Sequence, residues 1–217
     1  MKDDSASILF LISAPSGAGK TTVCQNLLAA NQRLVRAITC TTRPPRGGEV
    51  DGKDYYFLDR ETFARRIAAG EFLEHAEVYG NLYGTLSGEV NRLLGKGNHV
   101  LLNIDVQGAA LIRERAKQDP ALASALVTVF LTPGEWSELE RRLRTRGSDD
   151  EAVIAGRLQA AARELVASVD FDYLVLSGTM DEDRERMEKI LEVEGMRRGR
   201  HNLPEALTKP ANRLSET

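Results

Sequence analysis

Short apolar runs separated by helical patterns organise most of this chain. Runs with the length of a buried strand occupy residues 8–12, 34–38, 100–104, 126–131 and 173–176. Runs without polar alternation are typical of strands that are buried on both faces. Apolar residues at helical spacing lie between most of these runs. The alternation predicts an α/β domain whose parallel sheet is flanked by helices on both faces.

Two helix starts are signalled by capping residues. Thr132, Pro133 and Glu135 combine a capping side chain, a proline at the first helical position and an acidic residue at the third. Ser148 and Glu151 have the spacing of a second capping box. We therefore expect one helix to begin directly after Thr132 and another directly after Ser148.

Residues 41–88 interrupt this alternation. They contain paired prolines, paired glycines and aromatic pairs, with one short helix expected at 62–69. This composition predicts an inserted subdomain of small strands. Residues 199–217 are polar, contain two prolines and lack periodicity, which predicts a frayed tail.

A glycine-rich loop follows the first strand, and a helix is expected directly after it at 22–30. The loop and its continuation run Ala14, Pro15, Ser16, Gly17, Ala18, Gly19, Lys20, Thr21, Thr22. Such a turn points backbone N–H groups and the positive end of a helix dipole at an anion. Lys20 adds a point charge, and Thr21 adds a hydroxyl for magnesium. The sequence therefore predicts a nucleotide phosphate site, and a chance match is disfavoured by the flanking strand and helix.

Ala14 stands where the common pattern of this loop has its first glycine. We expect the backbone there to adopt a conformation that is open to residues with a Cβ atom.

Composition excludes several classes of protein. The chain has 217 residues, of which 42% are hydrophobic and 28% charged, an ordinary composition for one α/β domain. A net charge of −3 disfavours a polymeric nucleic acid as partner. Cys24 and Cys40 match neither a metal site nor a disulfide framework, so we expect free thiols in a reducing cytoplasm. The pattern predicts neither a signal peptide nor a membrane span.

A basic loop follows the second strand. Arg43 and Arg46 lie three residues apart among prolines and can present two planar forks to one phosphate. Tyr55 and Tyr83 add hydroxyls. Taken alone, this loop fits a solvated basic turn with core tyrosines equally well.

Together with segments 70–74, 81–85 and 105–108, these motifs make the chain resemble guanylate kinases, which phosphorylate GMP with ATP. The resemblance covers residues 8–195. It implies a P-loop nucleoside monophosphate kinase fold in a single domain with a core at 7–40, 89–142 and 166–198. It further implies a GMP-binding subdomain at 41–88, a helical lid at 143–165 and a polar tail at 199–217.

The resemblance also implies roles for individual residues. By this resemblance, the GMP phosphate is bound by Arg43, Arg46, Tyr55 and Tyr83. The guanine is contacted by Thr39, Glu74 and Thr85, and Asp105 lines the acceptor site. The resemblance assigns the ATP phosphates to residues 14–22, magnesium to Thr21, and the lid and donor side to Arg142, Arg146 and Arg157. Lys20, Arg43 and these three arginines form the expected catalytic set.

The chemistry of Glu74 gives an independent reason for its role. Guanine offers two hydrogen-bond donors on one edge, and a carboxylate can accept both. Adenine lacks this pair and would leave a buried carboxylate unsatisfied. The alternative for Glu74 is an exposed partner of a neighbouring cation.

For the arginines near residue 142, the alternative is a solvated helix face paired with Glu138 and Glu140. Arg141, Arg142, Arg144 and Arg146 cannot all lie on one face. We assign solvated positions to Arg141 and Arg144.

Two positions depart from the family pattern. Asn103 replaces a usual acidic residue, although Asp105, two residues on, is expected on the same face of the strand. Ser177 and Gly178 replace a usual Asn-Asp pair, so the adenine contact is expected to be weaker or to come from Ser177.

The expected activity is transfer of the terminal phosphoryl group of MgATP to GMP in the cytoplasm, with ATP and GMP as partners and the oligomeric state open. Two alternatives stand beside it. One is a catalytically silent guanylate kinase-like module that binds proteins, and the other is a P-loop kinase for another small phosphorylated acceptor.

Overall fold

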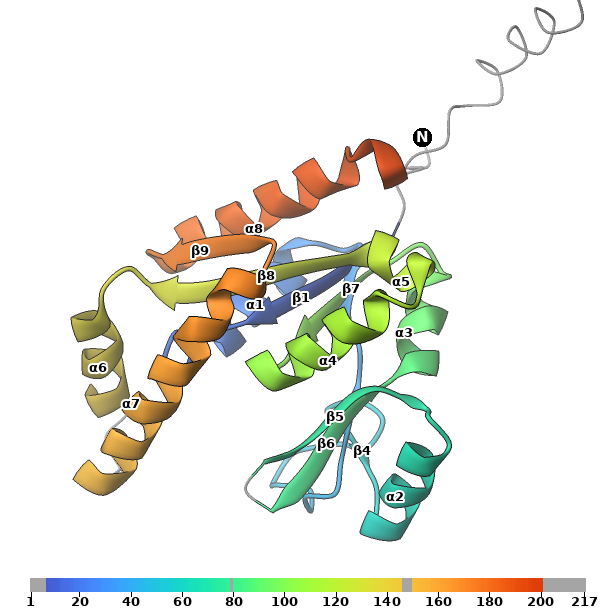
Figure 1. The fold of residues 1–217 in the computed structure, drawn as a ribbon, viewed down its shortest axis with the longest axis horizontal. Coiled ribbons are helices and arrows are strands. Elements are labelled where there is room, and N and C mark those ends of the chain that lie inside the picture. The colour runs from blue at the N-terminus through green and yellow to red at the C-terminus, as the bar shows by residue number, and fades with distance from the viewer. Residues whose placement is uncertain (1–6, 79, 146–149, 201–217) are drawn as a thin grey trace, which may run out of the picture.

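Two sheets organise the molecule (Figure 1). The structure is a computed structural model that describes residues 7–78, 80–145 and 150–200. The larger sheet has five strands in the order β2-β7-β1-β8-β9, and all neighbouring strands are parallel. Its strands are β1 (Leu9–Ser13), β2 (Leu34–Arg36), β7 (His99–Asn103), β8 (Leu126–Pro133) and β9 (Tyr173–Ser177).

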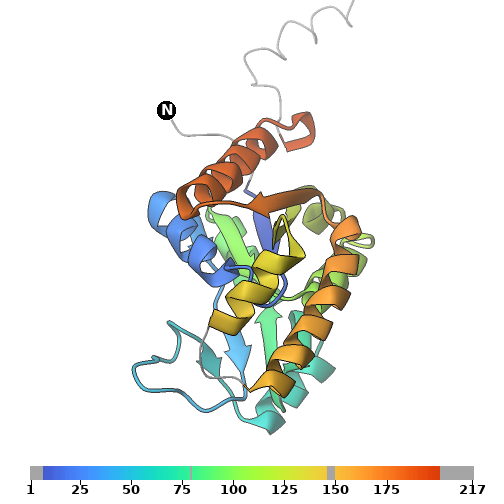
Figure 2. The ribbon, with the colours of Figure 1, turned by 90° about the vertical axis from the view of Figure 1, so that its left-hand side faces the viewer.

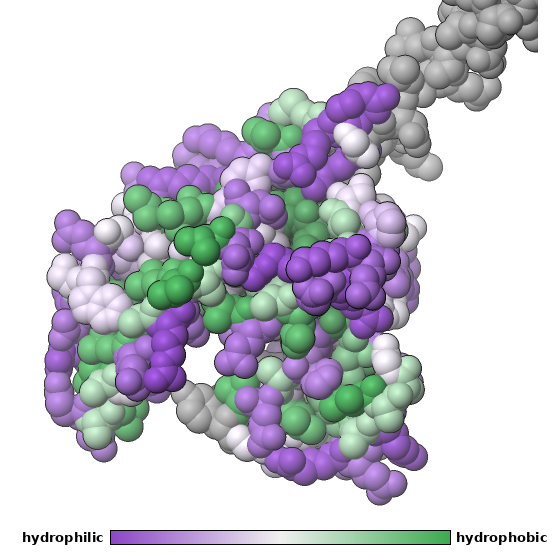
Figure 3. Space-filling model, viewed as in Figure 1, coloured by the Kyte–Doolittle hydropathy of each residue, from purple (hydrophilic) through white to green (hydrophobic). Residues whose placement is uncertain are grey.

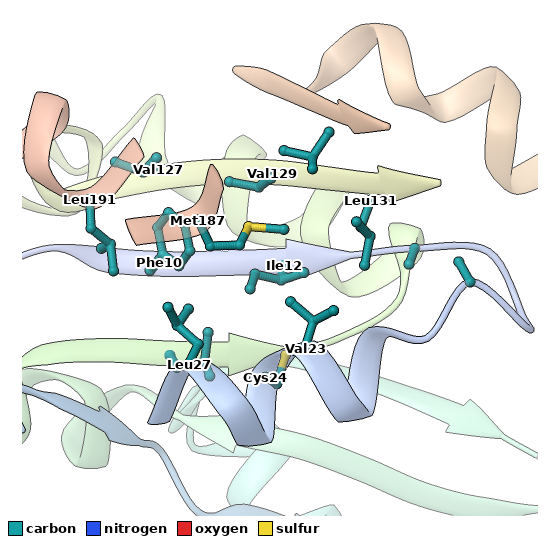
Figure 4. Packing of buried hydrophobic residues seen from close by; sticks show 14 of the residues in the cluster. Phe10, Ile12, Val23, Cys24, Leu27, Val127, Val129, Leu131, Met187 and Leu191 are labelled. Atoms are coloured by element: carbon teal, nitrogen blue, oxygen red, sulfur yellow. The ribbon is translucent and has the colours of Figure 1, made fainter. Parts of the chain in front are cut away.

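Helices cover this sheet on both faces, as the hydrophobic pattern predicts. The helices α1 (Lys20–Ala30) and α8 (Met180–Gly195) cover one face. The helices α3 (Ser87–Leu94), α4 (Val106–Ala116) and α5 (Pro120–Ala125) cover the other. Along β1, Phe10 and Ile12 pack against α1 and α8 (Figure 4), whereas Leu9 and Leu11 pack against the opposite helices. A strand buried on both faces needs apolar residues at every position, which explains the uninterrupted run.

The smaller sheet has the order β4-β3-β6-β5. Its strands are β3 (Thr39–Thr41), β4 (Tyr56–Phe57), β5 (Phe72–Val78) and β6 (Asn81–Leu86). The helix α2 (Arg60–Ala68) packs on it through Phe63, whose ring stacks on Phe72 with centroids 4.4 Å apart. This helix begins two residues before the expected start because the Asp59 side chain accepts the amide of Thr62 and caps it. The sheet begins at Thr39, before the expected boundary at residue 41.

Two further helices lie at the carboxyl end of the large sheet. They are α6 (Trp136–Thr145) and α7 (Glu151–Val166), and the short turn η1 (Ala167–Asp170) connects α7 to β9. In Figure 2, α6 and α7 lie in front of this end of the sheet. The space-filling view shows the molecule hollowed between these helices and the small sheet (Figure 3).

The first expected capping box was wrong in position. Thr132 and Pro133 belong to the end of β8, where they pair with Leu176 and Ser177, and α6 begins only at Trp136. Strand pairing therefore overrides a local helix signal. Asp150 caps α7 by accepting the amide of Val153, whereas Ser148 lies outside the described residues.

The regular structure after α8 also extends further than expected. The turn η2 (Arg198–Arg200) follows α8, and Arg200 is buried against Glu194, with Nη2 2.9 Å from Oε2. The expectation of a frayed tail from residue 199 was therefore wrong for residues 199 and 200, and the rest of that tail lies outside the described residues. No helix in the described ranges has the length and apolar character needed to cross a bilayer.

Candidate active site

The glycine-rich loop joins β1 to α1 at the carboxyl edge of the large sheet. Gly17 and Gly19 have φ angles of 90° and 91°, a left-handed conformation that other residues rarely adopt. A Cβ atom on Gly17 would also lie 3.0 Å from the Leu143 side chain. Ala14 is only 5% exposed and belongs to the core beside α1. The loop thus leads directly into the N-terminus of α1, where backbone N–H groups favour an anion.

Lys20 and Thr21 open α1. The ammonium of Lys20 donates to the carbonyl of Ile104 at 2.6 Å, which ties the lysine to the chain after β7. Burial lowers the pKa of Lys20, and the nearby Cys24, Asp105 and Glu164 raise it in part. Thr21 is exposed at the first turn of the helix.

The thiols of Cys24 and Cys40 are free and buried. Burial raises the pKa of Cys24 to about 12 and that of Cys40 to about 11, so both thiols are protonated at neutral pH.

Arg142 connects α6 to the loop. Its Nη1 lies 3.3 Å from the carbonyl oxygen of Ala18 and 3.4 Å from Oγ of Ser177. Its Nε donates to Glu138 at 2.7 Å. Arg142 is therefore anchored at the glycine-rich loop and is not part of a freely solvated face.

Ser177 is held in turn, because its hydroxyl donates to Asp183 at 2.7 Å. The hydroxyl expected to contact adenine is thus already engaged with Asp183 and Arg142.

The other arginines of this region occupy different settings. Arg141 and Arg144 are exposed and pair with Glu138 and Glu140, as expected of solvated positions. Arg157 is half-buried on α7. Arg146 lies outside the described residues.

A cavity of about 280 Å³ lies between the small sheet and the end of β7. Its lining consists of Thr39, Tyr55, Glu74, Ala76, Val78, Tyr83, Asn103, Ile104 and Asp105. Strand register explains why distant residues meet here. Thr39 pairs with Thr85, and Thr85 pairs with Glu74, so these three side chains form one row across the sheet. Tyr83 follows on the same face two residues from Thr85.

Glu74 is buried in this cavity at 6% exposure. Its Oε1 accepts the hydroxyl of Thr85 at 2.7 Å. Burial raises the pKa of Glu74, the charge of Asp105 raises it further, and the bond from Thr85 opposes the shift. The alternative of an exposed partner for a neighbouring cation is therefore wrong.

Asp105 and Asn103 reach the same cavity by different routes. Asn103 is the exposed last residue of β7. Asp105 lies beyond the strand and caps α4, where its side chain accepts the amide of Gly108 at 2.8 Å. The expectation that both residues share one face of a strand was therefore wrong, because β7 ends at residue 103 and the helix cap determines the direction of Asp105.

Arg43 and Arg46 meet at a third residue, Glu49. Nη2 of Arg43 lies 2.8 and 2.9 Å from the two carboxylate oxygens, and the backbone amide of Arg46 donates to the same carboxylate at 2.7 Å. The guanidinium of Arg43 lies 5.4 Å from the ring centre of Tyr55, whose ring meets that of Tyr83 edge-on at 6.2 Å. Glu49 raises the pKa of Arg43, and Arg43 lowers that of Glu49.

Sequence reasoning missed three residues of this site. Glu49 orients Arg43, and Glu164 accepts the amide of Ser16 at 3.2 Å. Gly108 leaves room for Glu74, since a Cβ atom there would lie 3.1 Å from Oε2. Glu164 carried a usable signal, because it lies seven residues after Arg157 and therefore on the same helix face.

These features define a P-loop kinase that acts on a small acceptor. The sequence model of the family described as guanylate kinase matches residues 7–194. A guanylate kinase from Nitrobacter hamburgensis is 42% identical over 193 residues, covering 89% of this chain and 85% of the relative. One from Clostridium perfringens is 40% identical over 194 residues, covering 89% and 87%. The crystal structure of guanylate kinase from Anaplasma phagocytophilum has a TM-score of 0.71 at 34% identity, covering 90% of each chain. The chain belongs to the guanylate kinase family.

Proposed function

We infer that this chain transfers the terminal phosphoryl group of ATP to GMP, giving ADP and GDP. The observation that carries the acceptor assignment is the buried carboxylate of Glu74 in a cavity separate from the phosphate loop. Thr85 donates to Oε1 of Glu74. The ring N–H and exocyclic amine of guanine would supply the further donors that a buried carboxylate requires. Adenine has no such pair on one edge, so this cavity favours guanine.

On the donor side, residues 14–22 would bind the phosphates of ATP, with Lys20 supplying positive charge. The exposed hydroxyl of Thr21 suits Mg²⁺, an ion that keeps waters and substrate oxygens among its ligands. When bound, magnesium neutralises charge on the phosphates.

On the acceptor side, Arg43 and Arg46 would bind the GMP phosphate with the hydroxyls of Tyr55 and Tyr83. Thr39, Thr85 and Asp105 would complete the guanine site with Glu74. Chemistry of this kind depends on in-line positioning and on positive charge around the transferred group. The acceptor oxygen of GMP is already ionised, so no general base is needed.

We assign residues 41–88 to acceptor binding and residues 143–165 to a lid. Closure of the lid would bring Arg146 and Arg157 over the transferred phosphoryl group, beside Arg142, and expel water. The contact of Arg142 with Ala18 supports its place beside the donor phosphates.

Neither alternative function fits these residues as well. A silent protein-binding module has no need for Lys20 and Thr21 at a helix N-terminus. A kinase for another phosphorylated acceptor leaves the buried Glu74 unexplained. The free thiols of Cys24 and Cys40 support a reducing, cytoplasmic location.

The test is a coupled assay of ADP formation from MgATP with GMP, AMP, CMP and UMP as acceptors. We expect kcat/KM for GMP to exceed that for each other acceptor by at least ~10²-fold, since mismatched buried polar groups discriminate strongly. Equal rates with AMP would overturn the acceptor assignment. ATP binding without turnover of any acceptor would favour the silent module.

A further inference from the structure

The phosphate loop is hydrogen-bonded to the C-terminal end of α7, the helix that makes up most of the expected lid segment at 143–165. The backbone amide of Ser16 donates to Oε2 of Glu164 at 3.2 Å, although the two residues are 148 positions apart in the chain. Ser16 lies within the loop, and Glu164 lies in the last turn of α7. The contact therefore connects the donor site directly to α7.

The setting of Glu164 distinguishes it from an ordinary surface carboxylate. It is half-buried, and burial raises its pKa, while the bond from Ser16 and the charge of Lys20 stabilise its ionised form. Ala161, one turn earlier, is fully buried in the core that also holds Ala14 and Ala18 of the loop. The core contact fixes this part of α7 against the loop, so Glu164 is held at the Ser16 amide.

The loop has few other means of fixing its backbone. Pro15 has no amide, its carbonyl accepts the amide of Ala18, and the glycines at 17 and 19 restrict the backbone less than residues with a Cβ atom would. From the side of α6, Arg142 contacts the carbonyl of Ala18. Glu164 thus holds the loop from α7 while Arg142 holds it from α6.

We propose that Glu164 is a positioning residue of the donor site, which orients the loop through the Ser16 amide and couples the loop to α7. The proposal rests on the proposed function, because it assumes that the loop binds ATP. Without the Glu164 carboxylate, the half-buried amide of Ser16 has lost its hydrogen-bond acceptor. The loop can then depart from the geometry that binds phosphates. A glutamine at this position keeps an oxygen that can accept the hydrogen bond from Ser16. The proposed role therefore requires a hydrogen-bond acceptor and not a negative charge.

The experiment compares Glu164→Ala and Glu164→Gln with Gln118→Ala, which removes an exposed polar side chain outside the phosphate loop, the lid and the acceptor cavity. Steady-state KM values for ATP and GMP are measured for each variant. Binding of a non-hydrolysable ATP analogue is measured by titration calorimetry, and thermal unfolding verifies the fold. We expect Glu164→Ala to raise KM and Kd for the donor ~10-fold, while KM for GMP stays within about twofold. Glu164→Gln should remain within about threefold of the parent, and Gln118→Ala should change nothing.

Any other result for the Glu164 variants contradicts the proposal. Tighter donor binding in both Glu164 variants would show that the carboxylate competes with the ATP phosphates. Equal increases in KM for ATP and GMP would indicate a general structural defect. If the parent protein binds the ATP analogue but does not use GMP, the proposed function fails, whereas the calorimetric comparison still tests Glu164.

Discussion

Both carboxylate oxygens of Glu49 lie within 2.9 Å of a single nitrogen, Nη2 of Arg43. The same carboxylate accepts the backbone amide of Arg46 at 2.7 Å, so one side chain organises the whole basic loop. Nη1 of Arg43 donates to the carbonyl of Pro44 at 2.7 Å. The guanidinium is thereby held beside Tyr55 before any acceptor arrives, which reduces the rotamer freedom that binding would otherwise remove.

Glu49→Gln should weaken GMP binding. An amide cannot form the charge-assisted pair with Arg43, so the guanidinium loses its fixed orientation. We expect KM for GMP to rise ~10-fold with little change in KM for ATP, as measured by steady-state kinetics. Glu61→Gln, at an exposed position on α2, is the control. A lower KM for GMP would show instead that Glu49 competes with the acceptor phosphate.

Arg43→Lys and Arg46→Lys should each impair GMP use although the charge is kept, because an ammonium cannot reproduce a planar fork. The structure separates the two residues: Arg43 pairs with Glu49 and lies beside Tyr55, whereas the Arg46 side chain is exposed. We therefore expect the larger rise in KM for GMP at Arg43. Calorimetry with an ATP analogue should give a nearly unchanged Kd, and parallel weakening of both substrates would point to misfolding.

Glu74→Gln should reduce kcat/KM for GMP by at least ~10-fold, equivalent to about 1.4 kcal/mol. An amide oxygen is a weaker hydrogen-bond acceptor than a carboxylate oxygen. The NH₂ group of the glutamine would also face one of the two N–H donors of guanine, and two donors cannot form a hydrogen bond. The discrimination against AMP should fall in parallel. The control is Glu77→Gln, an exposed residue of the same strand. Unchanged GMP kinetics would mean that guanine is recognised elsewhere.

The pH dependence of GMP use should reveal the burial of Glu74. Burial raises the pKa of this carboxyl, so ionisation at neutral pH costs folding free energy. That cost begins to shrink as the pH falls through the folded-state pKa and is gone below the unfolded-state pKa. GMP recognition has the opposite pH dependence and weakens as the pH falls, because only the ionised carboxylate of Glu74 accepts hydrogen bonds from both guanine donors. We expect kcat/KM for GMP to fall on acidification at a pH above the ordinary range of a glutamate.

The control for this pH profile is Glu74→Gln, which should lose that acidic limb. If the limb persists unchanged in the variant, another group controls it. Thermal unfolding at each pH separates loss of recognition from loss of fold.

Regular elements could be predicted where one local pattern determines them. The run at 8–12 is apolar at every position because both sheet faces are covered, and the structure confirms a strand there. Pro133 was misassigned because its pairing partner, Ser177, is far away in the chain. The Thr39, Thr85 and Glu74 row depends on cross-strand register, which no local pattern gives. The Ser16 and Glu164 contact likewise depends on how α7 packs.

Asn103 tests whether the chain lacks a catalytic charge. If an acidic residue at this position serves chemistry through its charge, Asn103→Asp should raise turnover by improving the placement of a lid arginine or of a magnesium-bound water. The structure favours the opposite outcome, because the cavity that Asn103 lines already holds the carboxylates of Glu74 and Asp105. A third carboxylate there would raise the pKa of Glu74 further and repel the phosphates of both substrates. We therefore expect kcat to be unchanged or mildly lower and KM for GMP to rise, in steady-state assays with Asn91→Asp on α3 as control. A gain in kcat beyond ~10-fold, or about 1.4 kcal/mol of barrier, would make Asn103 a true catalytic deficit.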